Sequence, residues 1–175
     1  MDLRQLAPGF FAAPQLEPSD MAALAAQGVT TVICNRPEVE NPPPLQAAAM
    51  QQAAEAAGLA FVFNPITMGA MTMDNVEEQS EAMAGSEGAV VAYCASGTRS
   101  AIMWALAQAG QMPTDDILSA AASGGYQLDG LRGQIDALAA EALAGWTANA
   151  GTIWAARLPG QSRRMTMTLP FGKSG

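Results

Sequence analysis

The residues GAVVAYCASGTRS, at positions 88–100, say most about how this 175-residue chain folds. The apolar run at 88–93 predicts a buried strand, and a helical pattern over Ser100–Gln108 follows it. Between them, Cys94 begins a loop of small residues that Arg99 closes. A strand that leads through a tight loop into a helix is typical of an α/β fold. The loop therefore predicts an anion pocket with a thiol at its base.

The setting of Cys94 favours its thiolate form. A helix N-terminus, a nearby guanidinium and inward backbone N–H groups all lower the pKa of a thiol. Arg99 can donate a bidentate pair of hydrogen bonds to an oxyanion, and Gly97 permits a backbone with positive φ. We expect Cys94 and Arg99 to be catalytic. The residues expected to bind the substrate or anion are Ala95, Ser96, Gly97, Thr98 and Ser100 of the loop, together with Arg36.

Arg36 follows a second predicted strand, the β-branched run Val29–Cys34. The carboxyl ends of parallel strands meet at one edge of a sheet, so we expect Arg36 near Cys94. It either adds positive potential there or forms a turn-stabilising salt bridge with Glu38. We interpret Cys34 as a buried apolar cysteine rather than as a thiol that resolves Cys94.

Predicted strands and helices alternate along the chain. This alternation indicates a mainly parallel central sheet with helices on both faces. We expect residues 1–145 to form one catalytic domain and residues 146–175 a basic extension that is not a separate domain. Strands are predicted at Phe10–Leu16, Val29–Cys34, Leu59–Phe63 and Gly88–Tyr93. Helices are predicted from a Ser19 or Asp20 cap to a stop at Gly28, at Leu45–Ala57, from Thr72 or Asp74 to about Met83, and at Ser100–Gln108, Ile117–Ala122 and Leu131–Leu143.

Composition excludes several classes of function. The absence of histidine removes Ser-His-Asp catalysis, Cys-His pairs and most zinc sites, and we expect neither a metal nor a cofactor. The formal net charge is −8, and all 16 acidic residues precede Gly145, so we expect no nucleic-acid partner. No apolar run approaches the ~18 residues that span a bilayer, so we expect no membrane partner. A cytoplasmic location with two free thiols is the default expectation.

The chain resembles two groups of proteins. Its loop looks like the active loop of rhodanese-type sulfurtransferases, Cys-x-x-Gly-x-Arg-Ser. Over roughly residues 1–135 the chain resembles the phosphatase-like domain of the beta-lactamase-hydrolase-like proteins, which implies a fold like that of the tyrosine and dual-specificity phosphatases. The segments that carry this second resemblance are Met1–Leu6, Pro14–Leu16, Val32–Pro37 and the Ser100–Gly110 helix.

Two departures from the phosphatase pattern favour sulfur over phosphorus. The cysteine phosphatases resemble one another in Cys-x5-Arg, whereas only four residues separate Cys94 from Arg99. A phosphatase also needs a general acid, but Pro65–Met71 contains none, and Asp74 is expected to cap the following helix.

The first hypothesis is therefore a thiol-dependent sulfurtransferase. A small-molecule sulfane-sulfur donor forms a persulfide on Cys94, and a thiol acceptor removes the sulfur. The alternative is a cysteine-dependent phosphatase that hydrolyses its substrate through a Cys94 thiophosphate. A second alternative is a non-catalytic module that binds an anion or a persulfide.

Overall fold

In the computed structural model, five strands form one sheet in the order β1-β2-β5-β3-β4. β1 pairs with β2 in antiparallel fashion, and the other neighbouring strands are parallel. This confirms the predicted mainly parallel sheet. The strands are β1 (Arg4–Ala7), β2 (Phe10–Ala13), β3 (Val29–Cys34), β4 (Ala60–Phe63) and β5 (Ala89–Tyr93).

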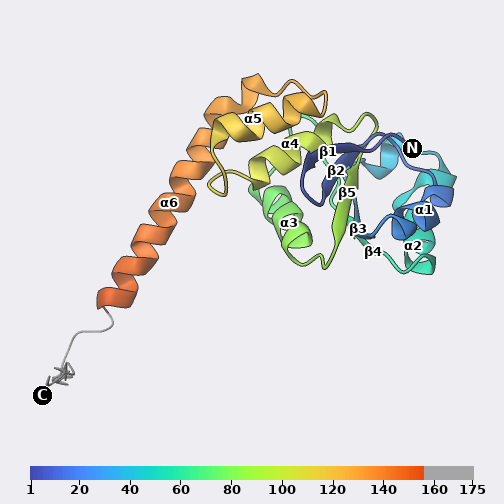
Figure 1. Cartoon of the computed structure of the whole chain (residues 1–175), viewed down its shortest axis with the longest axis horizontal. Helices are drawn as coiled ribbons and strands as arrows, with labels where there is room; N and C mark the ends of the chain where they lie inside the picture. Colours follow the sequence, from blue (N-terminus) through green and yellow to red (C-terminus); the bar gives the residue numbers. More distant parts are fainter. Residues whose placement is uncertain (156–175) are drawn as a thin grey trace, which may run out of the picture.

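Helices cover both faces of the sheet, with α1 and α2 on one side and α3 to α6 on the other (Figure 1). Short 3₁₀ turns at Pro18–Asp20, Glu38–Glu40, Pro43–Leu45 and Asp129–Leu131 join some of these elements. The helices are α1 (Met21–Ala26), α2 (Ala47–Ala56), α3 (Met73–Ala84), α4 (Thr98–Ala107), α5 (Thr114–Ser123) and α6 (Arg132–Ala155).

Burial on both faces explains why β5 is apolar throughout. Val90 and Ala92 pack into the core on the α4 side, while Val91 and Tyr93 pack into the core on the α1 and α2 side. A strand with two buried faces has no polar alternation. α4 is equally buried, since Trp104 is inaccessible to solvent and no residue from Ser100 to Ala107 is exposed. The loop between β5 and α4 is thus held at both ends by buried elements.

The N-terminal edge differs from the prediction. β2 ends at Ala13 rather than at Leu16, because Pro14 has no N–H to continue the ladder. The prediction also has no strand before Phe10, whereas β1 forms a hairpin with β2. Gly9 turns this hairpin with a φ of 77°.

The structure describes residues 1–155, with side chains through residue 145. α6 continues to Ala155, well past its predicted end at Leu143, and its C-terminal part runs away from the other elements (Figure 1). Alanine, the best helix former, is frequent along it. Within residues 1–155, no helix has both the length and the apolar character needed to cross a membrane. Most of the predicted extension at 146–175 lies outside the described residues, so that domain boundary stays a prediction.

Candidate active site

The loop that starts at Cys94 is fastened to the neighbouring strand β2. The Cys94 N–H donates to the Ala13 carbonyl (3.3 Å), and the Gln15 N–H donates to the Ala95 carbonyl (3.3 Å). Both contacts lie where β2 and β5 end, at the carboxyl edge of the parallel sheet. This is the edge at which ligands bind in α/β folds.

Gly97 directs the loop into α4. It is the N-cap of α4 and has a φ of 89°, a conformation that side chains larger than hydrogen disfavour. Its N–H donates to the Cys94 sulfur at 3.1 Å. α4 therefore begins directly beside the thiol, with its positive end turned towards it.

The environment of Cys94 favours the thiolate. Burial raises the pKa of Cys94, but hydrogen bonds from the backbone N–H groups of Ser100, Ser96, Arg99 and Gly97 outweigh it, and the pKa lies below its usual value. Only 1 % of the residue is exposed, so these donors rather than water stabilise the charge. The expected inward N–H groups are present, and they lower the pKa of this thiol without a histidine.

Arg99 is held in place by an ion pair that the sequence did not predict. Its two terminal nitrogens donate to both carboxylate oxygens of Glu40, at 2.8 and 2.7 Å, and one also donates to the Ile66 carbonyl at 3.0 Å. The Arg99 side chain is only 11 % exposed. The same hydrogen bonds from Arg99 lower the pKa of Glu40. Glu40 is thus an ionised anchor for Arg99 and a poor proton donor at neutral pH.

Arg36 shares this anchor. It donates to the Glu40 carboxylate (3.3 Å), to the Glu40 carbonyl (3.1 Å) and to the Gln15 side-chain oxygen (3.0 Å). Of the two roles considered for Arg36, the salt bridge with Glu38 is wrong: Arg36 pairs with Glu40, and Glu38 accepts the N–H of Ala47 at 2.7 Å. The structure brings Arg36 to the edge that carries Cys94, and its role in anion binding stays a prediction.

The loop hydroxyls divide into two kinds. Ser96 and Thr98 are exposed and hydrogen-bond each other through their hydroxyls at 3.0 Å. The Ser100 hydroxyl is buried and has no hydrogen-bond partner among the described residues. Ser100 is thus the loop residue with a hydroxyl still available for a ligand or for the Cys94 sulfur.

Cys34 is a buried residue on the α1 and α2 side of the sheet, as expected. It is 1 % exposed and packs with Tyr93, its partner in the pairing of β3 and β5. Burial raises the pKa of Cys34, which keeps it a neutral thiol. Both cysteines are free.

A buried amide cluster fixes the loop that precedes α3. Asn35 donates to the Asn64 carbonyl (2.9 Å) and to the Gln79 side-chain oxygen (3.0 Å). The Asn35 carbonyl accepts the Ile66 N–H at 3.0 Å. Since the Ile66 carbonyl in turn accepts a hydrogen bond from Arg99, this cluster places one of the partners of Arg99.

The N-cap of α3 is Thr72 and not Asp74. The Thr72 hydroxyl accepts the Asn75 N–H at 3.4 Å, and the Asn75 side chain accepts the Thr72 N–H at 3.1 Å. The expected capping role of Asp74 is therefore wrong, because the reciprocal pair of Thr72 and Asn75 already satisfies this helix end. Asp74 lies one residue inside α3 and is exposed.

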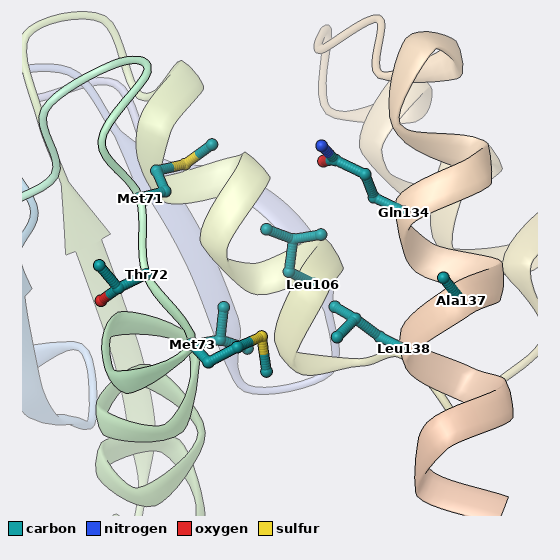
Figure 2. Close-up of a pocket in the computed structure, with 8 residues that line it drawn as sticks. Met71, Thr72, Met73, Leu106, Gln134, Ala137 and Leu138 are labelled. Atoms are coloured by element: carbon teal, nitrogen blue, oxygen red, sulfur yellow. The ribbon is translucent and has the colours of Figure 1, made fainter.

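An apolar pocket lies apart from this loop. Figure 2 shows it between α3, α4 and α6, with Met73, Leu106 and Leu138 lining its walls. Its volume is about 300 Å³, and no residue from 94 to 100 lines it. This cavity is therefore separate from the loop that carries Cys94.

Comparison with known proteins gives one family and one fold. Residues 2–111 match the sequence model described as "Beta-lactamase hydrolase-like protein, phosphatase-like domain". A curated Beta-lactamase hydrolase-like protein from Xylella fastidiosa is 33 % identical over 106 residues, which are 59 % of this chain and 25 % of that protein. The chain thus matches only about a quarter of the length of this relative.

Solved structures show the same fold. The crystal structure of a phosphatase candidate from Neisseria meningitidis is 31 % identical, covers 79 % of this chain and 99 % of its own, and has a TM-score of 0.68. The structure of PTPMT1 in complex with PI(5)P is 17 % identical, covers 81 % of this chain and 99 % of its own, and has a TM-score of 0.65. The latter similarity concerns the fold alone.

Proposed function

The chain belongs to the family of the phosphatase-like domain of beta-lactamase hydrolase-like proteins, and from this premise we propose that it is a cysteine-dependent phosphatase. One observation carries the proposal. The Cys94 sulfur lies under the backbone N–H groups of the loop at the start of α4, and Arg99 stands in the first turn of that helix. The nucleophilic sulfur and the groups that can donate hydrogen bonds to an anion are therefore close enough to act on one substrate phosphate.

The reaction has two displacements. In the first, the Cys94 thiolate attacks the phosphorus of a phosphomonoester, so that a sulfur–phosphorus bond forms while the bond to the leaving oxygen breaks. In the second, water attacks the phosphorus, the sulfur leaves as thiolate, and inorganic phosphate is released. The loop N–H groups and Arg99 hold the non-bridging oxygens throughout, where charge accumulates in the transition state.

The leaving group restricts the substrates. Pro65–Met71 supplies no carboxylic acid, and Glu40 is kept ionised by Arg99, so the leaving oxygen takes its proton from solvent. Phenolate-type leaving groups are stable enough to depart in this way, whereas alkoxides are not. We therefore expect aryl phosphates to be hydrolysed much faster than alkyl phosphates.

The test measures turnover of an aryl phosphate by the native protein, by Cys94→Ser and by Cys34→Ala as the matched cysteine control. We expect turnover in the native protein and in Cys34→Ala, and none in Cys94→Ser. Acid quenching during turnover should leave one phosphate on Cys94, detectable by mass spectrometry. Equal turnover in native protein and Cys94→Ser would refute the proposal.

Sulfur transfer is the second candidate, because four residues rather than five separate Cys94 from Arg99. Here the thiolate attacks the outer sulfur of thiosulfate, a sulfur–sulfur bond forms, and sulfite leaves with the electron pair. An acceptor thiolate then attacks that outer sulfur and releases Cys94. Thiosulfate-dependent persulfide on Cys94, with no hydrolysis of any aryl phosphate, would favour this candidate and overturn the phosphatase.

A further inference from the structure

Tyr126, between α5 and α6, lies against the reactive loop. It is only 5 % exposed, and its hydroxyl has no hydrogen-bond partner in the part of the chain that the structure describes. A Cβ atom built on Gly97 would lie 2.1 Å from this hydroxyl oxygen and 3.0 Å from the ring carbon that bears it. The tyrosine hydroxyl thus occupies the space in which any other residue at position 97 would carry its side chain.

Further contacts hold Tyr126 in place, one to its ring and one to its backbone. The Arg4 guanidinium lies 5.3 Å from the ring centroid, and the Tyr126 N–H donates to the Ala121 carbonyl at 2.9 Å. The ring also belongs to the main core on the α4 side of the sheet. Tyr126 thus lies between β1 and the loop, and its hydroxyl is the group that approaches the loop.

Fold stability does not explain this hydroxyl. A buried hydroxyl without a partner destabilises the folded state, and phenylalanine would pack the same ring without that penalty. What the hydroxyl does touch is Gly97, whose N–H donates to the Cys94 sulfur. Burial raises the pKa of Tyr126, and Arg4 lowers it. The charge of Cys94 also raises this pKa, so the phenol and the thiolate interact electrostatically.

We propose that Tyr126 is a positioning residue: its hydroxyl holds Gly97 in the conformation that keeps the Gly97 N–H on the Cys94 sulfur. It thereby helps to set the acidity of the nucleophile. The inference rests on the proposed role of Cys94, but it concerns the thiolate itself and is independent of whether phosphorus or sulfur is attacked.

The first experiment compares Tyr126→Phe with the native protein in the pH dependence of Cys94 alkylation by iodoacetamide, read by peptide mass spectrometry. We expect the midpoint to move to higher pH, so that the alkylation rate near neutral pH falls severalfold, while the urea unfolding midpoint stays equal or rises. Tyr93→Phe is the matched control, since it removes the other buried tyrosine hydroxyl, on the Cys34 side of the sheet.

An unchanged alkylation profile in Tyr126→Phe would overturn the inference, and so would an equal shift in Tyr93→Phe. A loss of stability in proportion to the loss of alkylation would also overturn it, because it would mean that Tyr126 acts on the fold as a whole. If Tyr126→Phe shows the expected shift of the alkylation midpoint but the native protein hydrolyses no phosphate ester, the proposed function is overturned and the role of Tyr126 stands.

A double-mutant cycle tests the contact directly. Gly97→Ala should slow alkylation strongly, because the new methyl group collides with the Tyr126 hydroxyl and the positive φ is strained. Adding Tyr126→Ala removes the collision and should restore part of the rate. Additive effects of the two substitutions would show that the residues act independently and would contradict the inference.

Discussion

Replacing Glu40 by glutamine tests how far catalysis depends on the placement of Arg99. The substitution keeps the shape of the side chain, but it removes the charge and puts an amide donor where one carboxylate oxygen faces Arg99. A hydrogen bond to a charged group contributes about 1.5–3 kcal/mol and a neutral one about 0.5–1.5 kcal/mol. Because the Glu40 side chain is 37 % exposed, water compensates part of the loss.

We therefore expect Glu40→Gln to cost about 1.5 kcal/mol of transition-state stabilisation, close to a tenfold loss of kcat/KM on an aryl phosphate. The loss should fall mainly on kcat. Arg99 is less well oriented in the variant, but the removal of a negative charge beside the anion site offsets the weaker binding of the ground state.

Glu38→Gln is the matched control. It makes the same change of charge in the same 3₁₀ turn, and its oxygen can still accept the Ala47 N–H. We expect its kcat/KM to stay within about twofold of native, as for most surface substitutions away from such contacts. Native kinetics in Glu40→Gln, or an equal loss in both variants, would refute the reasoning that the ion pair orients Arg99.

Three further predictions concern the thiol, the amide cluster and the α3 cap. Since the pKa of Cys94 is lowered in the folded protein, its alkylation should stay fast below the ordinary thiol pKa of about 8.5. The rate should decline only as the pH falls through the lowered pKa of the folded protein. In urea, the pH midpoint of alkylation should return to the ordinary thiol value. Asn35→Ala should destabilise the protein by about 1–3 kcal/mol in urea unfolding, because it leaves the buried Asn64 carbonyl without its donor; the Gln79 side-chain oxygen keeps its hydrogen bond from Asn64. Thr72→Ala should cost about 1 kcal/mol by the same measurement, whereas Asp74→Asn should change neither stability nor turnover appreciably.

The sequence predicted the strand–loop–helix setting of Cys94 because the residues that determine it are contiguous in the chain. The apolar run of β5, the glycine at 97 and the helical pattern after Ser100 are contiguous, and together they place Cys94 between a strand and a helix N-terminus. The cap at Thr72 could have been recognised from the asparagine three residues later, which can reciprocate its hydrogen bond.

The supports of the site could not be predicted in this way. Glu40 lies 59 residues from Arg99, and Tyr126 reaches Gly97 only after α4 and α5 have packed on the sheet. No periodicity marks such partners, since Glu40 lies in a short 3₁₀ turn and Tyr126 in an irregular segment, and tertiary packing places both side chains. β1 was missed for a related reason: four residues at a sheet edge carry little alternation of their own.

The shared carboxylate of Glu40 makes the reactive edge nearly neutral. Two guanidinium groups, Arg36 and Arg99, face one carboxylate and one thiolate, so their charges cancel before any ligand arrives. In the proposed reaction, a phosphate dianion at this edge would be held by the directed hydrogen bonds of the loop N–H groups and Arg99 rather than by a net positive charge. If the proposed hydrolysis takes place here, we expect little long-range attraction to retain the free phosphate after the ester bond has been cut.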